Sequence, residues 1–211
     1  MMMNQYLCAA RVLGPLAVGF GLLAAPHFLS AEEPCPHHDH SAMAAAEVSS
    51  EDSLYQSGIL WQDQFDRTLP VTTLAGQPVL VTMVYTRCAT ACPVLVEDIK
   101  QIHSAFADQG TDAQVLVVSL DHERDDAAHL HAFAERHGAN REGWHFVSGS
   151  AADIRTWAAL LGVRYRRTTE GNYDHSNVIA VLDASGELVF RQEGLAQGPH
   201  KAVEALARLP R

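Results

Sequence analysis

The sequence predicts an α/β domain in which a central mixed sheet is flanked by helices. Residues 79–85 and 115–120 are runs rich in valine in which Thr82 and Ser119 are the only small polar residues, as is typical of strands covered on both faces. Between them, apolar residues recur at helical spacing over residues 94–106. Residues 178–191 hold two further apolar runs around an Asp-Ala-Ser-Gly turn, which indicates an antiparallel hairpin.

The N-terminal segment has the layout of a secretory signal. Arg11 precedes an apolar run over residues 12–25, and small residues follow it. With residues 26–29 the run approaches the roughly 20 residues that a spanning helix needs, so an uncleaved membrane anchor is the alternative. We interpret residues 1–31 as a signal peptide or membrane anchor. The protein is then exported and periplasmic, either soluble or anchored to the inner membrane by this segment.

Residues 32–53 are poor in large apolar side chains and are interpreted as a flexible linker. The sulfur and imidazole side chains in this linker are Cys35, His37, His38, His40 and Met43. Imidazole and sulfur both bind copper well, so the cluster is a candidate accessory metal site. The alternative is a polar tether whose histidines cluster without a function.

Residues 54–211 are expected to form one domain, because 211 residues with 47% hydrophobic content bury a single core of ordinary size. Two short strands are expected first, one around Trp61 and one over residues 69–74. A Gly-Gln-Pro turn then leads into the strand 79–85.

The next elements alternate between helix and strand. A helix is expected to open at Cys92, because the proline that follows it is pre-organised for a first helical turn, and to stop at Gly110. After the strand 115–120, residues 125–137 again show helical spacing and end before a glycine.

The last third of the chain completes the fold. A strand at 144–147 and a helix capped by Ser150 come next, followed by strands at 163–167 and 178–182 that flank a loop. A helix over residues 199–209 closes the chain. This order is the thioredoxin arrangement, here with an N-terminal strand pair and an inserted strand and helix. We therefore predict a thioredoxin-like fold.

The charge balance excludes one class of partner. Lysine and arginine number 15 against 25 aspartates and glutamates, a formal net charge of −10. Binding to nucleic acid relies on cationic side chains that neutralise phosphates, so no nucleic-acid partner is expected. An acidic surface otherwise serves to keep the protein soluble.

Cys88 and Cys92 are the most informative residues of the chain. They lie at the predicted turn from a strand into a helix, where backbone amides and the positive helix end stabilise thiolates. If the signal is removed together with Cys8, the exported chain retains these two and Cys35. In an oxidising compartment the close pair is the one expected to form a disulfide. A purely structural disulfide is the alternative.

His175 is the predicted third member of the site. In a thioredoxin-like topology the segment before the strand 178–182 packs next to the cysteine turn, where reductases of this fold place a cis-proline. This chain has no proline over residues 164–182. Two thiolates and an imidazole suit copper(I) and also hold copper(II), and Asp174 is positioned to orient or tune the ring.

Three sequence runs resemble the Sco/SenC family over about residues 54–209. They are Tyr85-Thr86-Arg87-Cys88 with Cys92-Pro93, Val118-Ser119-Leu120-Asp121-His122-Glu123-Arg124-Asp125, and Asp174-His175-Ser176. The resemblance implies a thioredoxin-like domain that binds copper through Cys88, Cys92 and His175. It also implies a role in maturing the dinuclear copper centre, CuA, of cytochrome c oxidase.

The same resemblance implies partners for this protein, and the chain differs from the family pattern in two places. The copper-receiving protein would be cytochrome c oxidase subunit II, and other periplasmic copper chaperones are candidate partners. Family members often have proline where this chain has Ala89. The histidine-rich linker is not a family hallmark.

Three functional hypotheses follow. The first is a copper metallochaperone, a carrier rather than an enzyme, with a copper ion as its cargo. The second is a dedicated thiol-disulfide oxidoreductase in which Cys88 attacks and Cys92 resolves. The third is a peroxidase of peroxiredoxin type, to which Thr86, two residues before Cys88, gives a faint likeness.

Overall fold

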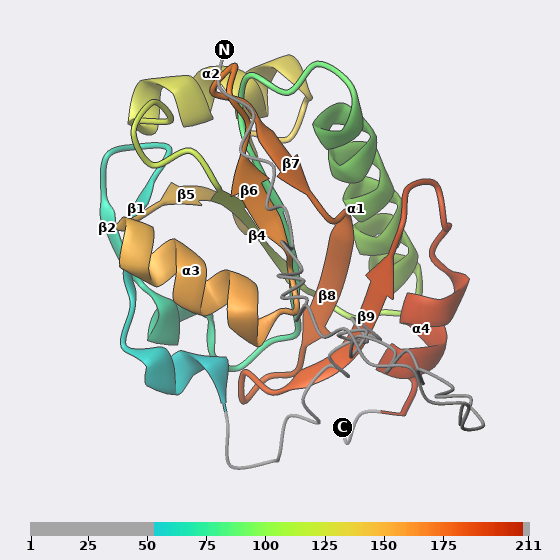
Figure 1. Ribbon diagram of the computed structural model, residues 1–211. Helices are drawn as coiled ribbons and strands as arrows, with labels where there is room; N and C mark the ends of the chain where they lie inside the picture. Colours follow the sequence, from blue (N-terminus) through green and yellow to red (C-terminus); the bar gives the residue numbers. More distant parts are fainter. Residues whose placement is uncertain (1–52, 209–211) are drawn as a thin grey trace, which may run out of the picture. The chain divides into compact units, whose positions relative to one another are not determined.

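The computed structural model describes residues 53–208, drawn in colour in Figure 1. The predicted signal or anchor and the five side chains of the candidate accessory site lie outside the described residues. In chain order the elements are η1 (Leu54–Ser57), β1 (Leu60–Asp63), β2 (Thr68–Pro70), η2 (Val71–Leu74), β3 (Val79–Val84), α1 (Ala91–Asp108), β4 (Gln114–Ser119), α2 (Ala127–Arg136), β5 (Trp144–Ser148), α3 (Ala151–Leu160), β6 (Tyr165–Arg167), β7 (Tyr173–His175), β8 (Val178–Leu182), β9 (Leu188–Glu193) and α4 (His200–Leu206).

Seven of the strands form one mixed sheet in the order β2-β1-β5-β4-β3-β8-β9. β3 pairs with β4 and β4 pairs with β5 in parallel, while β8 and β9 continue the sheet antiparallel on the other side of β3. Every residue of β3 and β8 is buried, as the valine-rich runs predict. The predicted α/β class with a central mixed sheet and flanking helices is confirmed.

The helices pack against this sheet through apolar side chains. α1 contacts β3 and α4, and α3 lies in front of the sheet in Figure 1. α3 is fixed to the sheet by Trp157, whose ring meets that of Trp61 in β1 edge-on with centroids 5.6 Å apart. Such a pair adds about 0.5–1.5 kcal/mol beyond the burial of its rings. The predicted cap is present, since the Ser150 hydroxyl accepts from the Asp153 amide in a capping box.

The N-terminal strand pair is confirmed, and β1 also pairs with β5, so that the pair extends the central sheet. Two local predictions are wrong. Val71–Leu74 is a 3-10 helix and not the second half of a strand, because its two buried residues lie three positions apart and face the core together. Residues 173–175 form β7 instead of part of a loop, because they pair with β6 in a small separate sheet.

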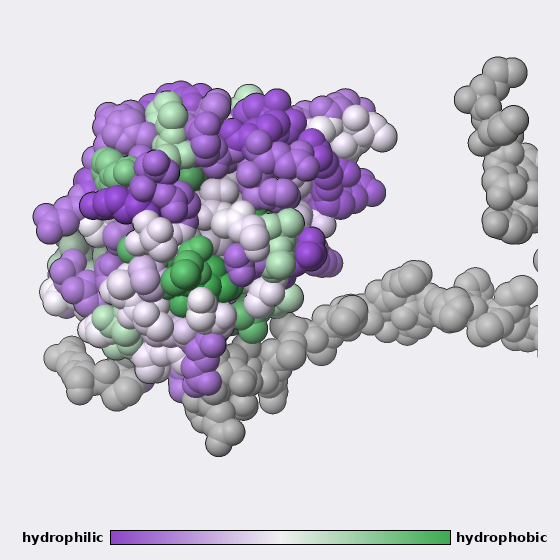
Figure 2. All heavy atoms as spheres, turned by 90° about the vertical axis from the view of Figure 1, so that its left-hand side faces the viewer, coloured by the Kyte–Doolittle hydropathy of each residue, from purple (hydrophilic) through white to green (hydrophobic). Residues whose placement is uncertain are grey.

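The face over α3, β1 and β2 is mainly hydrophilic and carries a small hydrophobic patch (Figure 2). The most exposed of the large apolar side chains that the structure describes is Leu60 of β1, at 59%. Within residues 53–208, no helix combines the length and apolar character that a membrane span requires.

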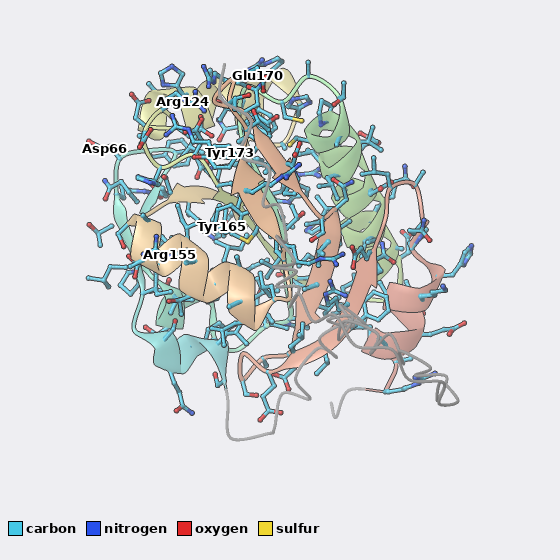
Figure 3. All side chains as sticks on the ribbon, viewed as in Figure 1. Asp66, Arg124, Arg155, Tyr165, Glu170 and Tyr173 are labelled. Atoms are coloured by element: carbon cyan, nitrogen blue, oxygen red, sulfur yellow. The ribbon has the colours of Figure 1, made fainter. Side chains whose placement is uncertain are left out.

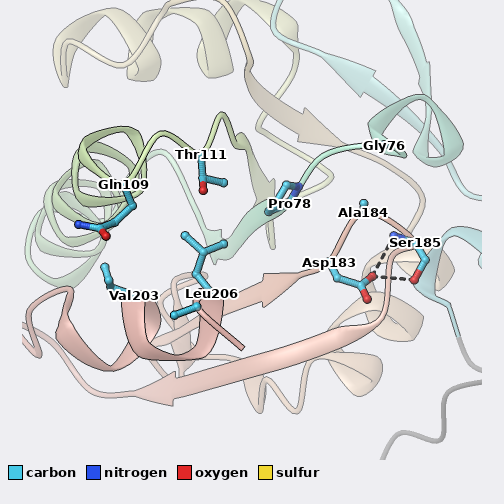
Figure 4. Close-up of a pocket in the computed structure, with 10 residues that line it drawn as sticks. Gly76, Pro78, Gln109, Thr111, Asp183, Ala184, Ser185, Val203 and Leu206 are labelled. Atoms are coloured by element: carbon cyan, nitrogen blue, oxygen red, sulfur yellow. Dashed lines mark hydrogen bonds between the residues drawn. The ribbon is translucent and has the colours of Figure 1, made fainter. Parts of the chain in front are cut away.

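A cavity of about 540 Å³ lies between α1, α4 and the turn at residues 183–185 (Figure 4). Pro78, next to the start of β3, lines this cavity, whereas the cysteine turn follows the end of β3. The two therefore lie at opposite ends of the same strand. No cysteine or histidine of the described chain lines the cavity, so the predicted site residues gather elsewhere.

Candidate metal centre

The turn between β3 and α1 holds both cysteines. Cys88 is 9% exposed and Cys92, in the first turn of α1, is fully buried. The Cys92 amide donates to the Cys88 sulfur at 3.4 Å, and the Cys88 amide donates to the Tyr85 carbonyl at 3.1 Å. Both cysteines are free thiols in this structure. The helix therefore begins by directing an unpaired backbone donor at a sulfur atom, as predicted for this turn.

The buried carboxylate of Asp125 fixes the start of this turn. It accepts hydrogen bonds from the Thr86 amide at 2.8 Å, from the Thr86 hydroxyl at 2.7 Å and from the Ser119 hydroxyl at 2.6 Å. Asp125 thereby joins the end of β3 to the end of β4. Because a buried carboxylate without donors is costly, these three bonds hold Thr86, and with it Cys88, in one place.

His175 approaches the cysteine turn from β7. Its Nε2 atom lies 3.6 Å from Cys92 Sγ, and its Nδ1 atom lies 3.1 Å from the Ser176 carbonyl oxygen. A carbonyl oxygen only accepts, so Nδ1 carries the ring proton and Nε2 presents its lone pair toward the sulfur. A sulfur and a nitrogen bound tetrahedrally to one ion at about 2.3 Å and about 2.0 Å are about 3.5 Å apart. The observed separation matches that of two ligands of one ion.

Asp174 faces away from the ring and binds Arg166, with 2.8 Å between its Oδ2 and the Arg166 Nη2. Its influence on the ring is electrostatic. Burial lowers the pKa of His175, and the Ser176 carbonyl and the Asp174 charge partly oppose that effect. A lowered pKa keeps the imidazole neutral near pH 7, which is the form that binds a metal ion.

The two thiols differ sharply in acidity. Burial alone would raise the pKa of Cys88, but the amides of Cys92, Thr90 and Ala91 and the Cys92 thiol outweigh it and lower the pKa to about 7. Burial raises the pKa of Cys92 far above its usual range. Without a metal ion, Cys88 therefore ionises around neutral pH, whereas Cys92 stays protonated there.

Tyr85 is a site residue that the sequence analysis did not single out. The Cys88 amide donates to its carbonyl, and burial followed by the Cys88 charge raises the pKa of the Tyr85 hydroxyl to about 12. Its ring lies 6.1 Å from that of His175, edge-on. Tyr85 and Asp125 both follow the carboxyl ends of parallel strands, where site residues of open α/β sheets gather. Their position after these strands could have identified them as candidate site residues from the sequence.

These contacts place the three predicted metal ligands, Cys88, Cys92 and His175, in the same region of the structure. They do not yet form a preorganised metal site. No three Cys, His, Asp or Glu side chains within residues 53–208 are already grouped as a metal site. Cys92 Sγ lies 3.6 Å from His175 Nε2, and the Cys88 sulfur lies 3.4 Å from the Cys92 amide nitrogen. The arrangement supports two kinds of chemistry: binding a soft metal ion, and thiol-disulfide exchange.

Comparisons with known proteins identify the family and support the fold. The SCO1/SenC family model matches residues 57–210. The SCO1 protein homolog of Bacillus subtilis (strain 168) is 20% identical over 143 residues, which are 66% of this chain and 74% of that protein. The structure of Arabidopsis thaliana ScoI with copper bound is similar with a TM-score of 0.64 at 18% identity, covering 72% of this chain and 97% of that one. BsSco, described as a cytochrome c oxidase assembly protein with a disulfide switch, gives 0.62 at 18% identity, covering 72% and 92%.

Removing the Asp125 carboxylate should destabilise the fold through the cysteine turn. We expect Asp125→Ala to lower the free energy of unfolding by about 3 kcal/mol, because it leaves three buried donors without an acceptor. Asp126→Ala is the matched control, since Asp126 caps α2 at an exposed position and its loss should cost about 1 kcal/mol. Urea denaturation measures both. Equal losses in the two variants would contradict the role given to Asp125.

The difference in acidity between the two thiols is also measurable. In reduced, metal-free protein, alkylation of Cys88 by iodoacetamide should rise with a midpoint near pH 7, because its pKa is lowered to about 7. Cys92 should stay unmodified throughout this range, because it is fully buried and its pKa is raised. Peptide mapping by mass spectrometry reports each cysteine separately. Equal rates at both cysteines would refute the assignment.

Proposed function

The chain belongs to the SCO1/SenC family, and on that premise we propose that it is a copper metallochaperone. Cys88, Cys92 and His175 hold the copper ion, which is cargo and is passed on by ligand exchange. The receiving site is CuA of cytochrome c oxidase, on subunit II. The protein delivers copper to that site, reduces the cysteines that receive it, or does both.

The observation that carries this proposal is the 3.6 Å separation of His175 Nε2 from Cys92 Sγ, together with the ring proton on Nδ1. A histidine held by its other nitrogen and aimed at a buried thiol is the arrangement expected of a metal ligand. Relatives add support, since the similar Arabidopsis protein is solved with copper bound and BsSco is described as an oxidase assembly protein.

The acidity of the thiols suggests how the ion is taken up and released. Cys88 is the more acidic thiol and ionises around pH 7, so it is the first sulfur available to an incoming ion, and Cys92 loses its proton when the ion binds. When the protein reduces an oxidised pair of cysteines on the receiving protein, Cys88 and Cys92 close into a disulfide, the client disulfide accepts the two electrons and is broken to two thiols, and both sulfur ligands are lost. Metal release and thiol oxidation are therefore coupled.

Two further parts of the proposal concern residues outside those that the structure describes. We propose export to the periplasm through residues 1–31, with or without retention as an inner-membrane anchor. Cys35, His37, His38, His40 and Met43 remain a proposed accessory copper site. Other periplasmic copper chaperones are proposed as the source of the ion.

Copper affinity is the decisive measurement. Titration of the reduced protein should show a loss of at least about 100-fold in Cys88→Ala and of about tenfold or more in His175→Ala, because changes that only touch a ligand's neighbours already cost 10–100-fold. All variants carry alanine at Cys35, His37, His38, His40 and Met43, so that the candidate accessory site in the linker does not contribute. His200→Ala, an exposed position in α4, is the control and should leave the affinity unchanged. Unchanged affinity in both site variants would defeat the proposal.

The second candidate is a dedicated thiol-disulfide oxidoreductase, and the contrast between the two thiols favours it. An attacking thiol works best with a pKa near the ambient pH, which fits Cys88, and a buried resolving thiol fits Cys92.

If this activity exists, metal-free reduced protein should reduce an oxidised peptide from the copper-receiving loop of subunit II at a rate that copper chelators do not change. Cys88→Ala should abolish the reaction. Cys92→Ala should instead trap a mixed disulfide between the peptide and Cys88, because the resolving thiol is missing. Mass spectrometry of the trapped species is the measurement, and no peptide reduction by the unaltered protein would exclude the activity.

A further inference from the structure

The hairpin of β6 and β7, which carries His175, is separate from the central sheet. Its two strands pair only with each other among the strands described, with Tyr165 opposite His175 and Arg167 opposite Tyr173. A two-stranded hairpin of this kind is marginally stable alone in water. Side-chain contacts must therefore hold it over the cysteine turn.

One part of that support is aromatic. The Tyr173 ring is 9% exposed and packs on the Tyr85 ring, with 5.6 Å between centroids. These contacts lie near His175 but leave the tip of the hairpin, residues 168–172, to be held by other groups.

The tip is held by two arginines that share one acceptor. Arg87, next to Cys88, donates through Nη2 to the Gly171 carbonyl at 3.3 Å, and Arg124 donates through its own Nη2 to the same oxygen. Arg167 adds an ion pair with Glu123 at 2.8 Å. Arg124 lies close to the labelled tip residue Glu170 and to Tyr173 in Figure 3.

Both arginines are anchored by the buried carboxylate of Asp121. Its Oδ2 accepts from Arg124 Nε at 2.6 Å and lies 3.9 Å from Arg87 Nη2, and the side chain is fully buried. Its Oδ1 has no hydrogen-bond partner among the described residues. A buried carboxylate with so few partners is costly unless cationic side chains neutralise it, so the ion pairs with Arg124 and Arg87 are retained. These ion pairs keep the two guanidinium groups at the tip of the hairpin.

Gly171 is suited to this contact. Its φ is +77°, and a Cβ added there would lie 3.2 Å from Arg124 Nη1. A side chain at position 171 would strain the backbone. It would also crowd the Arg124 guanidinium, which binds the carbonyl oxygen of the same residue. The close approach of Arg124 to the backbone thus depends on glycine.

We propose that Arg124 and Arg87, anchored on Asp121, are positioning residues that hold the β6–β7 hairpin closed so that His175 stays against Cys92. This deepens the proposed function and rests on it. Closing the tip fixes the imidazole in the three-ligand set, and opening it withdraws the imidazole and leaves two sulfurs. The arginines act on the metal site only through His175.

A double-mutant cycle tests this. Arg124→Ala should weaken copper binding about tenfold in the otherwise unaltered protein, because a charge-assisted hydrogen bond is lost and the closed state is less populated. In the His175→Ala background the same change should have less than about a twofold effect, because the arginine acts only through the missing ring. Arg208→Ala, exposed near the end of α4, is the control and should change neither. An equal loss in both backgrounds would overturn the proposal.

Hydrogen exchange tests the hairpin without copper. In metal-free reduced protein, Arg124→Ala should raise amide exchange over residues 165–175 about tenfold while leaving β3 unchanged, as expected of local opening. Gly171→Ala leaves Asp121 paired with its arginines and should give the same rise in exchange, so it is the variant to measure if Arg124→Ala does not fold.

Unchanged exchange over residues 165–175 in whichever of the two variants folds would refute the role of the arginines. If the unaltered protein binds no copper, the proposed function fails, and this experiment still decides whether the arginines hold the hairpin.

Discussion

The contact between Cys92 and His175 joins two segments that are 83 residues apart in the chain, and the site depends on it. Each partner reaches that contact through its own constraint. Cys92 is fixed because it lies in the first turn of α1, which follows the buried strand β3 after a short turn, and His175 is fixed because its Nδ1 atom donates to the Ser176 carbonyl. Neither constraint involves the other residue, so the two halves of the site are positioned independently and meet at the end of the sheet.

The two cysteines share a turn but not an environment, and this difference gives the site its two possible chemistries. Cys88 lies where several backbone amides point, and their effect exceeds that of burial. Cys92 lies one helical turn further on, where burial dominates. Cys88 can therefore attack a disulfide or bind a metal ion first. Cys92 reacts only after an ion has bound or a mixed disulfide has formed at Cys88. The two proposed functions, metal delivery and cysteine reduction, would both depend on this difference in acidity between the two thiols.

Local patterns were enough to predict most elements and the cysteine turn, because strand runs and helix starts depend on neighbouring residues. His175 was predicted from its place in the expected topology, and the family was predicted from three sequence runs. The exceptions are informative. β7 was predicted as a loop, since three residues that pair only with β6 carry almost no periodic signal. Asp125 and Arg124 were noticed only as parts of a family motif. Their roles come from bonds to Thr86, 39 residues away, and to Gly171, 47 residues away, which no local pattern encodes.

The three residues proposed as copper ligands lie on two kinds of support, and under the proposed function this difference would let one site both hold and release an ion. The sulfurs belong to the rigid part, where Asp125 ties together the ends of β3 and β4. The imidazole belongs to a hairpin outside the central sheet, held at its tip by hydrogen bonds from partly exposed arginines. Bonds of that kind are individually weak and open locally at modest cost, whereas the buried turn does not. Loss of one ligand at a time is the easiest route to ligand exchange, so under the proposed function the weaker support of the hairpin would make His175 the first ligand to leave.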